Sequence, residues 1–246
     1  MIYNFRDFIG LNAYLDANFI SLYAEFFLLF SICVLIAFLV IVDYVYDYKL
    51  ILSGVAANLT ILLLFLLFIL INNNSFDFLV FNQLLVQDNF NNIIKSVTTL
   101  SLISCILFSY NYIYKEKIVQ YEYFLLLLLS LVGLFTIINS NDLITMYLGI
   151  ELQSLSFYIL ASFKVYNNFS TEAGLKYFIL GAFSSGLLLL GCSLIYGFTG
   201  TTNFNDLYLL LVNNTEEMNI SPGILVSSLF ITVGILFKLG AAPFHM

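Results

Sequence analysis

Long hydrophobic stretches alternate with short polar segments along most of the sequence. Seven of them approach or exceed the roughly 20 apolar residues that a helix needs to cross a bilayer. Four of the connections are short, so we expect successive helices to be antiparallel neighbours. Longer polar connections lie at 72–95 and 199–223. The predicted spans lie near 22–42, 50–71, 96–113, 123–138, 143–163, 171–198 and 224–239.

Composition supports an all-α polytopic membrane protein surrounded by lipid. Hydrophobic residues make up 61% of the chain and charged residues 9%, and the mean hydropathy is +1.00. A soluble domain needs more charge than this to cover its surface. The net charge of −7 argues against a nucleic-acid partner. The three cysteines are scattered singly, so their spacing indicates neither a metal site nor a disulfide.

The first 21 residues resemble neither a secretory signal nor a transit peptide, because Arg6 is accompanied by Asp7 and Asp16. Abundant Phe, Tyr, Ile and Asn are typical of an AT-rich genome, so we expect an organelle-encoded protein. Basic residues in alternate connections indicate orientation. One side holds four and the other holds two, which places the N-terminus on the intermembrane-space side. The two sets are Lys49, Lys115, Lys117 and Lys164 against Arg6 and Lys95.

Ionisable residues inside predicted spans are the candidates for chemistry, because burying a charge in a membrane is costly. Glu151 lies about two turns into the fifth span, where its carboxyl group must bind a proton or pair with a cation. Lys238 lies in the seventh span, just before Gly240 and Pro243. Pro243 clashes with the carbonyl of Leu239 and Gly240 weakens the helix, so we predict a helix break one residue after the lysine. Broken helices recur at ion sites in transporters.

Three further residues are weaker candidates. Glu172 and Lys176 are four residues apart in the first turns of the sixth span, capped by Ser170 or Thr171, which favours an end-of-helix salt bridge. Lys176 lies deeper and is also a candidate proton relay to Glu151. The sequence leaves open whether Glu151 pairs with Lys176, with Lys238, or alternates between them. His245, the single histidine, either passes protons after the break or caps a helix end.

Two more features of the spans have structural interpretations. Glu25, at the outer end of the first span, is interpreted as structural because that span carries no partner for it. Small residues from Gly181 to Gly191 indicate close packing of the sixth span against another helix.

Several strings resemble the antiporter-like subunits of respiratory complex I (NADH:ubiquinone oxidoreductase), and in particular its chain 2. The resemblance is strong from about residue 139 onwards. It rests on the strings SNDL (140–143), MYLGIELQS (146–154), FSTEAGLKYF (169–178), LGAFSSG (180–186), LIYGFTG (194–200) and FKLGAAPFH (237–245).

The resemblance implies a three-helix segment at 1–122 and an incomplete first antiporter-like repeat at 123–246, truncated at the broken seventh helix. It implies that Glu151, Lys176 and Lys238 translocate protons, coupled to quinone reduction elsewhere in the inner mitochondrial membrane. FMN, iron–sulfur clusters and ubiquinone would then be bound in other parts of the complex, with no cofactor or metal in this chain. The expected partners are other membrane subunits and a separate chain that supplies the missing half.

Three other functions are compatible with parts of this pattern. A subunit of a multi-subunit sodium/proton antiporter would share the buried Glu and Lys, although the residues of the GIELQS string (149–154) favour complex I. A seven-helix receptor has no need for Glu151 and Lys238 beside a broken helix. A purely structural membrane subunit requires that neutralising both residues leaves pumping intact. No phosphate loop, dinucleotide fold or nucleophile with its base is evident.

Overall fold

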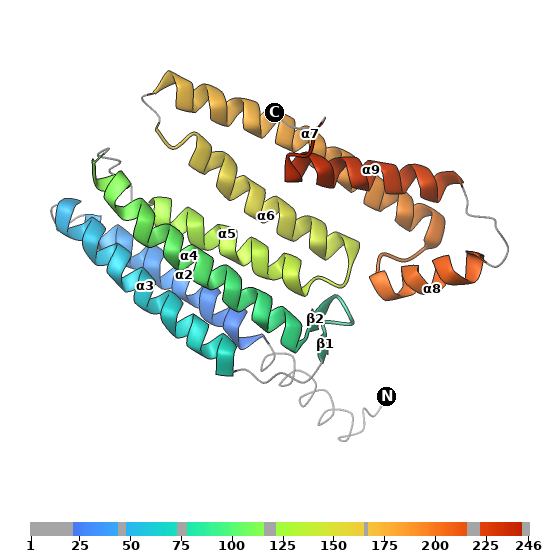
Figure 1. Cartoon of the computed structure of the whole chain (residues 1–246), viewed down its shortest axis with the longest axis horizontal. Helices are drawn as coiled ribbons and strands as arrows, with labels where there is room; N and C mark the ends of the chain where they lie inside the picture. Colours follow the sequence, from blue (N-terminus) through green and yellow to red (C-terminus); the bar gives the residue numbers. More distant parts are fainter. Residues whose placement is uncertain are drawn as a thin grey trace, which may run out of the picture. The chain divides into compact units, whose positions relative to one another are not determined.

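The computed structural model describes residues 22–43, 48–72, 78–115, 122–164, 167–215 and 222–242 (Figure 1). Nearly all of these residues are helical. The chain forms two compact units, Met1–Leu125 and Leu126–Met246. Six of the described helices are long and apolar enough to cross a membrane, and a seventh contains the shorter apolar segment Tyr23–Phe38. The prediction of an all-α polytopic membrane protein is confirmed, and each of the seven predicted spans corresponds to a helix.

The first unit contains three helices and one β-hairpin. Its elements are α2 (Tyr23–Asp43), α3 (Tyr48–Asn72), β1 (Phe78–Val80), β2 (Leu85–Gln87) and α4 (Asn89–Lys115). Helix α3 packs against both α2 and α4. Leu59, Leu63 and Leu66 recur at three- and four-residue intervals on α3 and are fully buried, as expected for the side of a helix that faces its neighbours.

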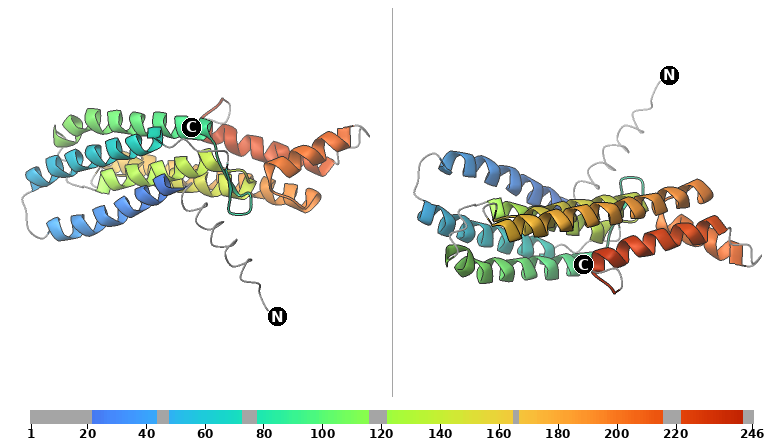
Figure 2. Two further views of the ribbon diagram at one scale, coloured as in Figure 1. Left: turned by 90° about the horizontal axis from the view of Figure 1, so that it is seen from below. Right: turned by 90° about the horizontal axis from the view of Figure 1, so that it is seen from above.

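The second unit contains most of α5 (Glu122–Asn139), followed by α6 (Leu143–Ala161), α7 (Asn168–Thr199), α8 (Phe204–Thr215) and α9 (Pro222–Leu239). Helix α7 packs against α6 and, most extensively, against α9. The right-hand view of Figure 2 shows α9 lying along α7. A methyl group at Gly191 would lie 2.9 Å from the backbone nitrogen of Ile231, so the absence of a side chain allows these two helices to approach closely.

The two long connections contain secondary structure that the hydropathy pattern does not predict. The connection expected at 72–95 holds the antiparallel β1–β2 hairpin, in which Leu79 pairs with Val86. The connection expected at 199–223 holds the amphipathic helix α8. Both segments are too short and too polar to register as membrane spans.

Two expectations about helix ends were wrong. Helix α4 begins at Asn89, so Lys95 lies inside a helix instead of in a loop. Helix α7 begins at Asn168 and is capped by the side chain of Asn167, which accepts a hydrogen bond from the amide of Phe169; neither Ser170 nor Thr171 is the cap. In both cases polar residues extend a helix beyond the apolar segment that sequence reasoning recognises. Glu25 finds its partner outside its own helix, in Lys95 of α4.

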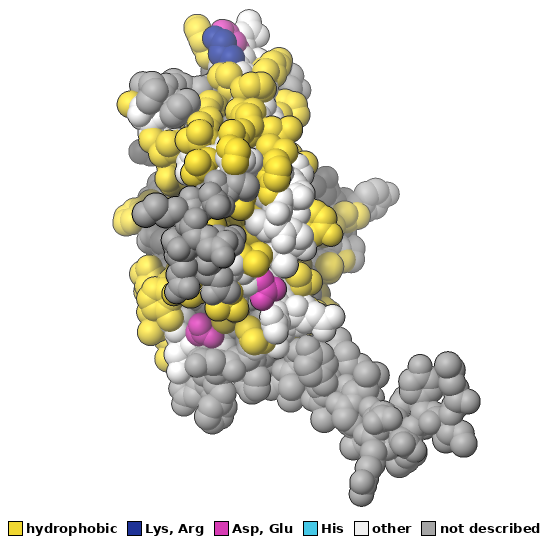
Figure 3. All heavy atoms as spheres, turned by 90° about the vertical axis from the view of Figure 1, so that its right-hand side faces the viewer, with side chains coloured by type: hydrophobic (Ala, Val, Ile, Leu, Met, Phe, Trp, Pro, Cys, Tyr) yellow, Lys and Arg dark blue, Asp and Glu magenta, His cyan; other side chains and the backbone are white. Residues whose placement is uncertain are grey.

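Much of the outer surface is apolar. Figure 3 shows one face on which most of the described side chains are hydrophobic and few are charged. Large exposed side chains include Phe30, Phe108 and Phe183. A water-soluble monomer rarely exposes continuous apolar areas of this kind, whereas lipid or another membrane subunit covers them without cost.

Candidate functional site: an ion pair between two membrane helices

The position of the candidate site is fixed at the start of α6. Asp142 is buried and caps the helix, accepting a hydrogen bond from the amide of Ile144 at 3.2 Å. The backbone on either side of Asp142 pairs with residues 202–204: the amide of Leu143 donates to Thr202, and the amide of Phe204 donates to Asn141. The α5–α6 turn is therefore joined to the α7–α8 turn. Asn141, Asp142 and Leu143 of the SNDL string thus have a structural role, because they join these two turns.

Glu151 and Lys238 form an ion pair between α6 and α9. The Nζ atom of Lys238 lies 3.7 Å from Oε1 of Glu151, and the two side chains are 17% and 23% exposed. Oε1 of Glu151 is buried and accepts no hydrogen bond in the structure. The pair is therefore close enough for electrostatic attraction but is not a tight hydrogen-bonded salt bridge. Of the two lysines that sequence reasoning left open as partners of Glu151, the structure brings Lys238 to it.

Tyr158 is a further partner of the lysine. Lys238 Nζ donates a hydrogen bond to the Tyr158 hydroxyl at 3.1 Å and lies 5.6 Å from the centre of its ring. Tyr158 lies on α6, seven residues after Glu151, so the two residues are two turns apart on one side of the helix. Sequence reasoning missed Tyr158. The seven-residue spacing from a buried acidic residue is the signal that could have revealed it.

Residues of α7 hold the Tyr158 ring in place. The rings of Tyr177 and Phe178 contact it edge-on, with centroids at 4.7 and 5.7 Å. A methyl group at Gly181 would lie 2.1 Å from the Tyr158 hydroxyl oxygen, so the hydroxyl occupies space that only glycine leaves open. The aromatic contacts and the glycine together fix the position of the hydroxyl.

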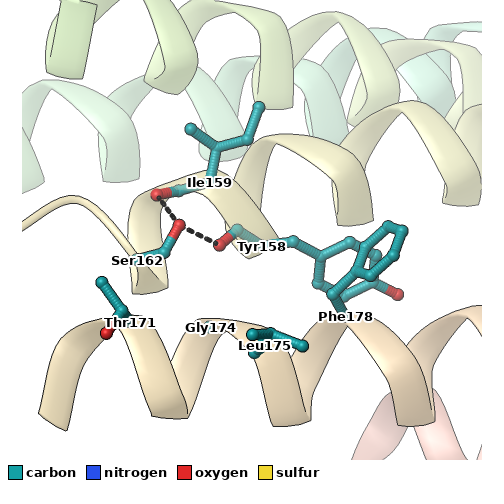
Figure 4. Close-up of a pocket in the computed structure, with 7 residues that line it drawn as sticks. All are labelled: Tyr158, Ile159, Ser162, Thr171, Gly174, Leu175 and Phe178. Atoms are coloured by element: carbon teal, nitrogen blue, oxygen red, sulfur yellow. Dashed lines mark hydrogen bonds between the residues drawn. The ribbon is translucent and has the colours of Figure 1, made fainter. Parts of the chain in front are cut away.

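A groove of about 320 Å³ lies between α6 and α7 beside this tyrosine (Figure 4). Its walls are mainly apolar, with hydroxyl groups contributed by Ser162 and Thr171. Ser162 donates hydrogen bonds to the carbonyls of Tyr158 and Ile159. The groove therefore runs from the α6–α7 connection to the Tyr158 ring.

The lysine lies in the last turn of α9, which ends at Leu239. Gly240 has a φ of +66°, a conformation that glycine adopts readily. The amide of Gly240 donates to Phe237 and the amide of Ala241 donates to Leu236, which is the Schellman pattern of a helix C-terminus. Helix α9 thus ends one residue after Lys238, and the left-handed conformation of Gly240 is the direct cause of this end. Pro243 and His245 lie outside the described residues.

Lys176 is paired elsewhere in the structure. It forms an ion pair with Glu172 one turn earlier on α7, and their side chains are 66% and 60% exposed. Within the described segments, Lys238 is the cation within ion-pair distance of Glu151. The expected end-of-helix salt bridge is present, and a relay role for Lys176 stays a prediction.

A second buried ion pair lies in the first unit. Lys95 of α4 is completely buried and forms an ion pair with Glu25 of α2. It also donates a hydrogen bond to Gln87 Oε1 at 2.9 Å, and Gln87 in turn donates to Asn92 at 2.7 Å. This network joins two helices and the hairpin. In the part of the chain that the structure describes, no group of three or more His, Cys, Asp or Glu residues is arranged to hold a metal ion.

Comparison with known proteins places these helices in a family. A family model described as "NADH:quinone oxidoreductase/Mrp antiporter, TM" matches residues 140–246, which include α6, α7 and α9. NADH-ubiquinone oxidoreductase chain 2 of Marchantia polymorpha is 42% identical over 239 residues, covering 94% of this chain and 48% of the relative. The chain belongs to the NADH:quinone oxidoreductase/Mrp antiporter family of membrane subunits.

Other relatives within the family agree. Chain 2 of Arabidopsis thaliana is 47% identical over 168 residues, covering 68% of this chain and 34% of the relative. NADH-quinone oxidoreductase subunit N of Pelagibacter ubique is 42% identical over 239 residues, covering 96% and 46%. The chain spans about half the length of the curated relatives it matches over most of its sequence.

Solved structures of the family share the fold. A chain of respiratory complex I from Thermus thermophilus aligns with a TM-score of 0.68 at 23% identity, covering 90% of this chain and 45% of that one. A chain of the Mrp complex from Dietzia sp. aligns with a TM-score of 0.63 at 19% identity, covering 93% and 42%. At these identities the likeness concerns the fold alone.

Proposed function

We propose that this chain is part of a proton-translocating membrane subunit of NADH:ubiquinone oxidoreductase, in which Glu151 and Lys238 move protons. The observation that carries the proposal is the ion pair between α6 and α9, inside helices long enough to span a membrane. Redox chemistry, with FMN, iron–sulfur clusters and ubiquinone, belongs in this proposal to other subunits of the complex.

The geometry of the pair suits a change of charge state. In a low-dielectric environment the charge of one partner strongly affects the proton affinity of the other. At 3.7 Å the carboxylate and the ammonium attract each other without a short hydrogen bond that would hold them together. A nearby change in charge can therefore separate the pair and leave each side chain to another partner. We propose that repeated separation and re-forming of the pair carries protons past it.

The sequence relatives favour complex I over a sodium/proton antiporter. The curated relatives at 42–47% identity bear names of NADH-ubiquinone and NADH-quinone oxidoreductase subunits. The likeness to the Mrp complex rests on fold at 19% identity. Transport by membranes that contain this chain is therefore expected to require NADH and quinone and to be independent of sodium.

Charge-neutralising variants test this proposal in the whole complex. Glu151→Gln and Lys238→Met are each expected to reduce NADH-driven proton uptake by membrane vesicles about tenfold or more, as for other essential proton-transfer groups. Glu122→Gln, an exposed acidic residue at the start of α5, is the matched control and should behave like the unmodified complex. Full proton uptake by both site variants, in normally assembled complex, would leave only a structural role for the pair.

We also place the chain in the inner mitochondrial membrane with its N-terminus facing the intermembrane space. The plant mitochondrial relatives support the compartment. The relocation of Lys95 into α4 leaves four lysines on the proposed matrix side against Arg6 on the other, which strengthens the bias. A cysteine introduced by Lys164→Cys, in a chain lacking its three native cysteines, should react with an impermeant reagent only from the matrix side.

Other membrane subunits of the complex are the proposed partners of this chain. Mass spectrometry of the intact, detergent-purified complex tests this point. Flavin and iron–sulfur subunits in the same particle support the assignment. A complex that contains only antiporter-type membrane subunits contradicts the assignment to NADH:ubiquinone oxidoreductase.

A further inference from the structure

The geometry points to Tyr158 as a positioning residue for proton transfer, the alternative partner that holds Lys238 while Glu151 changes its charge. The inference rests on the proposed function of the pair. Lys238 Nζ lies 3.1 Å from the Tyr158 hydroxyl but 3.7 Å from Glu151 Oε1. The lysine is thus hydrogen-bonded to the tyrosine and only electrostatically attracted to the glutamate.

The chemistry of the two partners differs in a useful way. A carboxylate binds a protonated lysine strongly, but it has no proton to donate to a neutral amine. A phenol hydroxyl can accept a hydrogen bond from the ammonium and can also donate one to the neutral amine. Tyr158 therefore keeps Lys238 satisfied in both protonation states. Without it, a lysine released by Glu151 would be a largely buried polar group without a hydrogen-bond partner, which is costly.

The tyrosine is built to stay in place during such a change. Its ring is held edge-on by Tyr177 and Phe178, and its hydroxyl lies against Gly181. All three residues belong to α7, whereas the lysine comes from α9. The side chain that moves is accordingly the lysine, whose side chain has four rotatable bonds and whose two partners lie two turns apart on α6.

The test removes the hydroxyl and keeps the ring. In the assembled complex, Tyr158→Phe is expected to slow NADH-driven proton uptake about tenfold, the size expected for loss of one hydrogen bond to a charged group. Tyr177→Phe is the matched control, because the Tyr177 ring contacts Tyr158 but its hydroxyl does not bind Lys238. Equal rates for the two variants, with equal amounts of assembled complex, would overturn the inference.

A double variant separates positioning from a merely structural effect. Glu151→Asp keeps the carboxylate but shortens the side chain by one methylene group, which moves the charge away from Lys238. The variant should therefore retain partial activity. If Tyr158 and Glu151 are alternative partners, Tyr158→Phe combined with Glu151→Asp should lose more activity than the product of the two single losses. A loss equal to that product would mean that the residues act independently and would contradict the inference.

These outcomes are distinguishable from failure of the proposed function. If Glu151→Gln and Lys238→Met abolish proton uptake while Tyr158→Phe behaves like Tyr177→Phe, the pair translocates protons and the tyrosine does not assist it. If both charge-neutralising variants pump normally, the proposed function itself fails and the inference fails with it.

Discussion

Lys95 and Glu25, seventy residues apart in sequence, form an ion pair in the first unit with the lysine completely buried. The pair joins α2 to α4, and Gln87 extends the contact to the β-hairpin. A fully buried lysine is rare in proteins and persists only when it is paired and hydrogen-bonded. The hairpin and the helix ends around it are thus held by polar contacts as well as by apolar packing.

Removing one member of this pair should destabilise the subunit. Glu25→Leu leaves the Lys95 charge without its acidic partner, which typically costs about 3–5 kcal/mol. We expect the complex containing this variant to lose activity at a lower temperature. Replacing both residues, by Glu25→Leu and Lys95→Met, should restore most of the stability, because the uncompensated charge is gone. A double variant as unstable as the single one would contradict this explanation.

Gly181→Ala is expected to displace Tyr158. The added methyl group would lie 2.1 Å from the tyrosine hydroxyl, and the edge-on contacts with Tyr177 and Phe178 restrict the ring's retreat. Overpacking of this kind costs about 1–3 kcal/mol. Proton uptake should fall to about the level of Tyr158→Phe. Gly186→Ala, on the same helix with open space around it, is the control and should leave proton uptake unchanged.

Close packing of α7 on α9 should be equally sensitive to size. A methyl group at Gly191 would lie 2.9 Å from the Ile231 backbone nitrogen, and backbone cannot move aside as a flexible side chain can. Gly191→Ala should therefore lower the amount of assembled complex on native gels. Gly197→Ala, also on α7 but without a neighbour within 4 Å, should assemble normally. Similar amounts of the two variants would show that α9 adjusts its position.

The exposed Glu172–Lys176 pair tests whether Lys176 relays protons. Exposed pairs contribute little to stability, so neither Glu172→Gln nor Lys176→Ala should change the thermal inactivation midpoint. A relay needs the lysine and not its partner. If Lys176 is part of the proton path, Lys176→Ala slows proton uptake while Glu172→Gln does not. If proton uptake is unchanged in both variants, Lys176 is not a relay and the pair is only a salt bridge at the start of α7.

The cap of α6 gives a prediction about helix stability. Asp142→Ala removes the acceptor for the Ile144 amide and should cost about 1 kcal/mol. Asp142→Asn keeps an oxygen in the capping position and should recover most of that loss. The thermal inactivation midpoint of the complex measures both. An Ala variant as stable as the original would show that the neighbouring backbone pairing suffices.

Sequence periodicity and hydropathy predicted the helices well because lipid imposes a simple rule on length and composition. The predicted span at 123–138 and helix α5 (Glu122–Asn139), for example, differ by one residue at each end. The same reasoning placed α4 seven residues too late, because Asn89 to Lys95 is polar and reads as a loop. It also missed the β1–β2 hairpin, whose pairing depends on backbone hydrogen bonds that a hydropathy window does not detect.

The candidate site was partly predictable for the same reason. An acidic and a basic residue inside spans are conspicuous, so the sequence alone identifies Glu151 and Lys238 as candidates. Their pairing required knowledge of how α6, α7 and α9 pack, which is a tertiary property. Tyr158 is one of 17 tyrosines, and its spacing of seven residues from Glu151 is the only hint of it in the sequence; its importance follows from its distance to Lys238.

Helices α6 and α7 are fastened to each other near both ends. At one end the backbone around Asp142 pairs with residues 202–204, and at the other Ser170 donates a hydrogen bond to the carbonyl of Ala161 at 2.9 Å. Such a frame resists shear, so sliding of one helix past the other would break hydrogen bonds at two places at once. We therefore expect α6 and α7 to stay in place during the proposed proton transfer, with the movement confined to rotation of single side chains.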